Sequence, residues 1–126
     1  MRHAVRDGED VTLGQRIRRA ALDRPGANLA GGDLVYLWRP DAAQVASVGV
    51  ATDKARTAAI YRRPSKDFEE QASNGRASAL HLARSVPLQG GIPLVRDGEV
   101  VGAIGVSGAS SADEDQELAV LGSQAA

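Results

Sequence analysis

Apolar and polar positions between residues 90 and 106 alternate in a way that predicts a β-hairpin. Two runs rich in β-branched residues, Ile92–Val95 and Glu99–Val106, are separated by the segment Arg96–Gly98. The Asp-Gly pair in this segment is a strong hairpin signal, because a tight turn of the primed type needs positive φ angles. Both faces of the second run are apolar, so we expect helices to cover this strand on both sides.

The pattern after the hairpin predicts a C-terminal helix over Ala112–Gly122. Ser111 and Glu114 form a capping-box pair, and the acidic residues 113–115 place negative charge at the positive end of the helix dipole. The glycine at the end of this range is typical of a residue that terminates a helix in the left-handed conformation. We therefore expect Ser123–Ala126 to be a tail.

A second helical pattern follows Pro40 and Asp41, and small or apolar residues recur along it at the spacing of one helix face. Two neighbouring seams result: Val45, Val48, Thr52, Ala55 and Ala59, and beside them Val50, Lys54, Thr57 and Tyr61. Because burying an unpaired ammonium group is costly, Lys54 should have a partner. Two roles stay open for it. In the first, the side chain extends to solvent or pairs with Asp53 or with a carboxylate of the last helix. In the second, it contacts an anion at a pocket or subunit interface.

Shorter elements surround this helix. Alternating side chains predict a strand over Asp33–Trp38, which the chain enters through a turn at Gly31–Gly32. Ser65 is placed to cap a short helix over Lys66–Gln71, and Ala77–Ala83 is either a short helical piece or irregular. Together these elements indicate an α/β sandwich in which helices flank an antiparallel sheet on both sides.

The N-terminal quarter carries weaker signals. Met1–Asp10 is polar and charged, so we expect a tail there. Thr12 and Gln15 form a capping box that predicts a first helix, and Ala27–Ala30 leaves room for only a short strand before the glycine turn. We expect the 126 residues to form a single domain.

Composition narrows the functional classes. A formal net charge of −1 gives no electrostatic case for binding nucleic acid or an anionic membrane, and the absence of cysteine excludes disulfides and thiolate metal sites. No apolar run is long enough to span a bilayer, and the first residues lack the apolar core of a signal peptide, so the cytoplasm is the expected location.

Few residues suit chemistry. The two histidines, His3 and His81, are too far apart in sequence to show metal-ligand spacing, so no metal site is predicted. Backbone N–H groups at the start of the last helix and at the glycine pair 90–91 can bind a carboxylate or phosphate. The ligand-binding candidates are therefore Lys54, His81, Gly90, Gly91, Gly105, Ser107 and Gly108, and Lys54 is also the candidate catalytic residue. The alternative is that these glycines only permit tight turns and close packing.

Several short blocks occur in the order found in one known family. They are AGGDLVY at 30–36, VASVGVATDKARTAA at 45–59, ASNG at 72–75, GGIPL at 90–94 and GEVVGAIGVSG at 98–108. This combination resembles the family of small haem-binding or haem-degrading domains, and the similarity spans roughly residues 28–122. That family includes a streptomycete extracellular haem-binding protein, a glycolate-operon accessory protein and the C-terminal domain of a propanediol-type corrinoid adenosyltransferase.

The resemblance implies a profilin- or roadblock-like sheet, assembly into homo-oligomers, and haem as a cofactor. The residues able to serve as an axial ligand to haem iron are His3, His81, Tyr36, Tyr61 and Met1. Three hypotheses for the function follow. The chain is a small-molecule binding protein for haem, another tetrapyrrole or a small organic acid; or an accessory enzyme that acts on a small organic acid through Lys54 and the segment Gly105–Gly108; or a ligand-free oligomeric scaffold.

Overall fold

The computed structural model describes residues 31–39, 41 and 43–124. The expected N-terminal tail, the first helix and the strand stub at Ala27–Ala30 lie outside the described residues, and so does His3. The elements in chain order are α2 (Ser47–Tyr61), α3 (Lys66–Ser73), the 3-10 helix η2 (Ala77–His81), β1 (Gly91–Arg96), β2 (Glu99–Gly105) and α4 (Ala112–Gln124).

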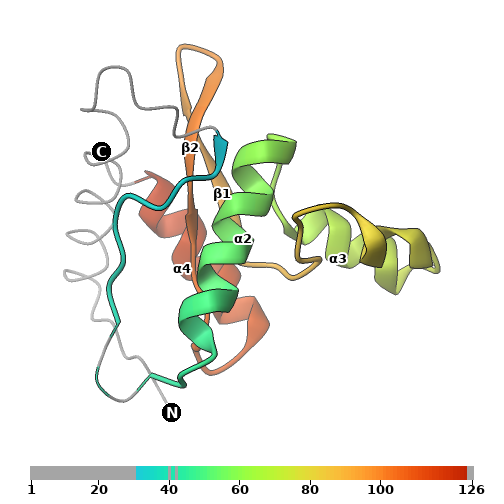
Figure 1. Ribbon diagram of the computed structural model, residues 1–126, viewed down its shortest axis with the longest axis horizontal. Coiled ribbons are helices and arrows are strands. Elements are labelled where there is room, and N and C mark those ends of the chain that lie inside the picture. Colours follow the sequence, from blue (N-terminus) through green and yellow to red (C-terminus); the bar gives the residue numbers. More distant parts are fainter. Residues whose placement is uncertain (1–30, 40, 42, 125–126) are drawn as a thin grey trace.

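Helices α2 and α4 lie on opposite faces of the β1–β2 hairpin, and α3 extends to one side of this sandwich (Figure 1). Both helices pack on both strands. This arrangement confirms the predicted fold class, an antiparallel sheet flanked by helices. In the described part of the chain the sheet has two strands.

The hairpin forms where the sequence predicts it. Strands β1 and β2 pair antiparallel, and the two-residue turn places Asp97 at φ 51° and Gly98 at φ 80°, as a primed turn requires. The pairing shifts by one residue between Leu94 and Val95, which leaves Val101 as an additional residue on β2. Such a bulge increases the local twist of the strand pair.

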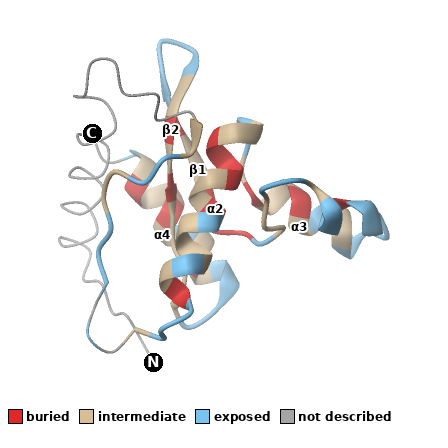
Figure 2. Cartoon of the chain, viewed as in Figure 1, coloured by how far each residue is buried: buried red, intermediate tan, exposed pale blue. Residues whose placement is uncertain are grey.

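The core is small and lies between the hairpin and α4. Leu94, Ile104 and Ala119 are buried there. Four half-buried apolar side chains pack against them: Val35, Ile92, Val101 and Val106. Buried residues lie along the inner sides of the helices and the strands (Figure 2). On the other side of α2, the ring of Phe68 meets the ring of Tyr61 edge-on, with centroids 5.1 Å apart.

The predicted strand at Asp33–Trp38 is wrong. This segment runs extended past α2 and β2 but joins no sheet (Figure 1). It lines a cavity together with β2 residues 102–105, and in the described part of the chain the sheet contains only β1 and β2. The segment is therefore an extended strap whose side chains are half-buried or exposed.

The predicted helix start at Pro40 and Asp41 is also wrong, because α2 begins at Ser47. Residues 41, 45 and 46 lie in turns, and the backbone N–H of Ser47 donates to Gln44 O. Val45 therefore lies outside the helix and is 80% exposed. The other predicted seam is the more buried one, because Lys54 and Thr57, which belong to it, are both buried.

Helix α4 starts at Ala112 as predicted, and the backbone N–H of Glu114 donates to Ser111 Oγ at 3.1 Å. The predicted end at Gly122 is wrong, because the helix continues to Gln124. Gly122 is buried within the last turn, so it serves close packing rather than termination.

Helix α3 extends to Ser73, two residues beyond its predicted end. Ser65 precedes it as expected but makes no side-chain cap. Its buried hydroxyl instead donates to Leu88 O at 2.6 Å and accepts from the N–H of Gly91 at 2.8 Å. The tertiary contact thus competes successfully with the local cap, and it fixes the loop that leads into β1.

Candidate functional site

Lys54 lies in the middle of α2 with its side chain 4% exposed. Its ammonium group is 3.0 Å from Oδ2 of Asp115 on α4 and 3.0 Å from the carbonyl oxygen of Val106. Of the roles left open by the sequence, the structure shows the pairing with a carboxylate of the last helix. The charge is compensated within the chain, so the amine of Lys54 is not exposed to a substrate.

The polar groups around this ion pair are also engaged within the chain. Asp115 Oδ1 accepts the backbone N–H of Ala109 at 2.9 Å, and Gln116 Oε1 accepts that of Gly90 at 2.9 Å. Gln89 Nε2 donates to Asp113 at 3.0 Å. Two of the N–H groups expected to receive an anion, those of Gly90 and Ala109, therefore already donate to side chains of α4.

At three of the glycine candidates, another part of the backbone lies so close that a side chain would not fit. Gly91 and Gly105 face each other across the hairpin. A Cβ at Gly91 would overlap the carbonyl oxygen of Lys54, and one at Gly105 would overlap that of Ala51. Gly90 has φ 121°, and a Cβ there would lie 2.7 Å from Val106 O. The backbone of α2 therefore occupies the space that the facing glycines leave free.

The remaining candidates lie in different places. Gly108 has φ 99° in the turn before α4, and Ser107 beside it is half-buried. His81 is exposed at the end of η2 and does not line the cavity described next. The structure therefore brings Gly90, Gly91 and Gly105 close to α2 and Lys54, and it leaves His81 apart from the cavity.

A cavity of about 80 Å³ lies between the extended segment, α2 and β2. Its walls are mainly backbone and small or apolar side chains, and its polar lining comes from Asp33, Tyr36, Thr52 and Arg56. Sequence reasoning missed this site, although Tyr36 is among the candidate axial ligands. The signal available in the sequence is the alternation of apolar and polar residues in the extended segment, which also resembles a strand.

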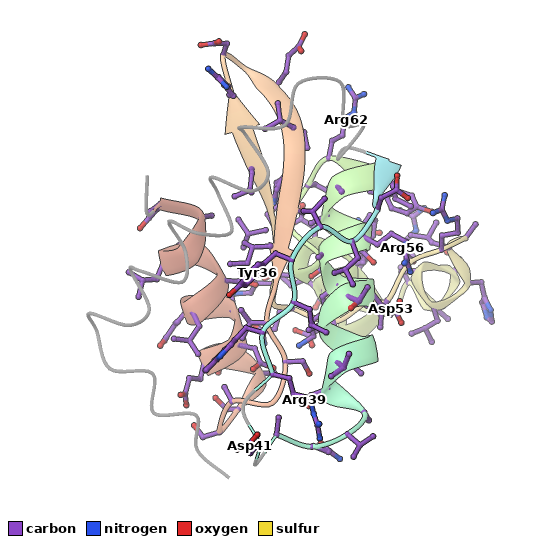
Figure 3. All side chains as sticks on the ribbon, turned by 60° about the vertical axis from the view of Figure 1, so that its left-hand side comes forward. Tyr36, Arg39, Asp41, Asp53, Arg56 and Arg62 are labelled. Carbon is purple, nitrogen blue, oxygen red and sulfur yellow. The ribbon has the colours of Figure 1, made fainter. Side chains whose placement is uncertain are left out.

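One charged pair lies at the rim of the cavity. Arg56 Nη1 is 3.0 Å from Asp53 Oδ1, and the two side chains are 30% and 54% exposed. Figure 3 shows both residues on one side of the extended segment, whereas Tyr36 projects toward the side where α4 lies. Next to the cavity, the apolar side chains Leu34, Leu37 and Trp38 are 57%, 45% and 50% exposed.

Haem, which the sequence resemblance implies, fits this site in chemistry but not in volume. Pockets that enclose drug-sized ligands measure roughly 300–1,000 Å³, well above the cavity's approximately 80 Å³. The phenol of Tyr36 is a suitable iron ligand in kind, and the exposed apolar side chains suit a macrocycle. Haem would therefore lie mostly outside the cavity, against the extended segment.

Within the described ranges, no group of three or more His, Cys, Asp or Glu residues is placed to hold a metal ion. In the same part of the chain, no helix is both long enough and apolar enough to cross a membrane.

The structure defines a small α/β protein with a small cavity between the extended segment, α2 and β2. The family model described as "Haem degrading protein HbpS-like" matches residues 27–124, and the chain belongs to that family. The predicted family is thereby confirmed. The match also covers all of the sequence blocks that carry the resemblance.

Two curated relatives are similar in sequence. Protein GlcG of Escherichia coli K12 is 42% identical over 77 residues, which are 61% of this chain and 58% of GlcG. An uncharacterized 15.0 kDa protein of the dhaT-dhaS intergenic region of Citrobacter freundii is 31% identical over 93 residues, 71% of this chain and 65% of the relative. The chain thus spans less than two thirds of either relative.

Solved structures share the fold. A double mutant of Streptomyces reticuli HbpS superposes with a TM-score of 0.70 at 26% identity, covering 91% of this chain and 82% of that one. A PduOC:heme complex superposes with a TM-score of 0.71 at 24% identity, covering 100% and 96%. The second likeness establishes the fold alone.

Proposed function

We propose that the protein is a small-molecule binding protein whose ligand is haem or a related tetrapyrrole. The observation that carries the proposal is the exposed apolar surface formed by Leu34, Leu37 and Trp38 beside a cavity that Tyr36 and Arg56 line. A contiguous exposed apolar surface next to polar anchors is typical of a binding site. Membership of the HbpS-like family supports the same ligand class, and the PduOC:heme complex has the same fold.

The proposed assembly is a homo-oligomer, because haem on an open surface leaves one face of the macrocycle in water. A second copy of the chain would cover that face. The cytoplasm stays the location predicted from the sequence.

The geometry favours binding over catalysis by Lys54. Its ammonium group is buried and bonded to Asp115 and Val106. A lysine nucleophile or base must release its proton and reach a substrate, and this one would first have to leave a buried ion pair.

The test is a haemin titration followed by absorbance, with size-exclusion chromatography of the same samples. We expect a saturable Soret shift near one haem per chain. Tyr36→Phe and His81→Ala compare two axial candidates within the described residues. Loss of the shift in Tyr36→Phe with retention in His81→Ala supports the site at the cavity, and the reverse result places the iron at His81. A folded wild-type protein that gives no shift overturns the proposed function.

A further inference from the structure

The cavity has the volume of a short side arm rather than of a macrocycle. A water molecule takes about 30 Å³ of liquid volume, so about 80 Å³ corresponds to the space of two or three water molecules. Its walls bring together backbone and side chains of three separate segments, the extended segment, α2 and β2. A carboxylate group, with three non-hydrogen atoms, is of this size, so the cavity has room for the acidic end of a short side arm.

Arg56 supplies a positive charge where such a group would enter. A guanidinium carries five N–H donors, and in the described part of the chain Arg56 makes one side-chain hydrogen bond, from Nη1 to Asp53 Oδ1. The stem of Arg56 packs close to Gly32, where an added Cβ would lie 2.7 Å from Cγ. The absence of a side chain at Gly32 therefore lets Arg56 lie along the cavity wall, with donors remaining for a carboxylate.

Apolar surface adjoins this charge. Leu34 and Leu37 line the cavity and are also about half exposed, so they connect the cavity with the outer surface on which Trp38 lies. A ligand that matches both features has a large flat apolar body and a short acidic arm. Asp33, which also lines the cavity, and Asp53 select against a second acidic arm in the same place.

We infer that the cavity is a carboxylate subsite in which Arg56 holds one propionate arm of the tetrapyrrole while the macrocycle lies on Leu34, Leu37 and Trp38. This inference rests on the proposed function and adds a selectivity to it. The protein distinguishes the free acid of a tetrapyrrole from its ester. Arg56 acts as a binding residue whose charge is shared between Asp53 and the ligand.

The experiment compares haemin with haemin dimethyl ester by absorbance titration of the wild type, Arg56→Gln and Arg62→Gln. Arg62 is the matched control, because it is an exposed arginine at the end of the same helix and does not line the cavity. We expect the ester to bind the wild type roughly two- to fivefold more weakly than haemin, the range for a charge pair at a partly exposed site. Arg56→Gln should bind both ligands equally, and Arg62→Gln should behave as the wild type does.

Two further variants separate the cavity from the charge. Asp53→Asn removes the competing carboxylate and should tighten haemin binding while leaving the ester unchanged. Ala103→Leu places a larger side chain in the cavity wall and should reduce the preference for the acid, and its thermal unfolding shows whether the fold is retained. Equal binding of acid and ester to the wild type, or an acid preference that survives in Arg56→Gln, overturns the subsite but leaves the proposed function standing. If neither ligand binds the folded wild type, the proposed function and the subsite both fall.

Discussion

The ammonium group of Lys54 and the carboxylate of Asp115 lie 3.0 Å apart across the sandwich, joining α2 to α4 past the end of β2. Both side chains are less than a tenth exposed, and each makes a further hydrogen bond to backbone. A buried pair of this kind holds two elements in a defined orientation, although a well-packed apolar pair can stabilise a fold equally well.

Lys54→Met leaves the carboxylate of Asp115 buried without its counter-charge. We expect the free energy of unfolding to fall by about 3–5 kcal/mol, measured by urea denaturation. The double variant Lys54→Met/Asp115→Leu should recover part of this loss, because no unpaired charge remains. A double variant whose loss equals the sum of the two single losses would show that the pair contributes no coupling.

Gly105→Ala should destabilise the protein strongly, because the new methyl group would overlap the carbonyl oxygen of Ala51. We expect a loss of about 1–3 kcal/mol, the range for overpacking in a close-packed site. Gly49→Ala is the matched control. Gly49 is exposed in α2 with open space around its Cβ position, so alanine should stabilise the helix by up to about 1 kcal/mol. Thermal unfolding of the two variants should therefore shift in opposite directions.

Gly98→Ala tests the hairpin turn. Gly98 has φ 80°, with no atom near its Cβ position, so the cost comes from the backbone conformation and not from a collision. We expect a loss of about 1–2 kcal/mol in chemical denaturation. Gly98→Asn should cost less, because asparagine tolerates the left-handed region better than alanine. Equal losses for the two variants would argue against a conformational cause.

Ser111→Ala tests the cap of α4. The hydroxyl oxygen of Ser111 accepts the N–H of Glu114, and its removal should cost about 1 kcal/mol. Ser73→Ala, at the exposed end of α3, is a control serine outside an N-cap position. Urea denaturation should separate the two variants, and a Ser111→Ala midpoint equal to that of the wild type would contradict the cap.

The sequence predicted the features that depend on neighbouring residues. The turn at Asp97 and Gly98 and the start of α4 follow from local conformational rules, and the structure shows both. The need for a partner at Lys54 followed from the cost of burying a charge. Its identity did not, because Asp115 lies 61 positions away in the chain and α4 carries three neighbouring acidic residues.

The features that the sequence could not predict depend on packing between distant segments. The alternation at Leu34, Tyr36 and Trp38 is the same for a paired strand and for an extended segment held away from the sheet. The cavity is lined by that segment, by α2 and by β2, which are far apart in the sequence, so no local spacing encodes it. The site at the cavity was therefore visible only in three dimensions.

The facing glycines 91 and 105 limit how α2 can move. They form a shallow notch across the two strands, and two carbonyl oxygens of α2, one turn apart at Ala51 and Lys54, lie over it. If the helix slid by one residue it would also rotate by about 100°, and a side chain would replace a carbonyl above the notch. The helix is thereby prevented from rolling, so the direction in which Lys54 points is set by two residues that have no side chains.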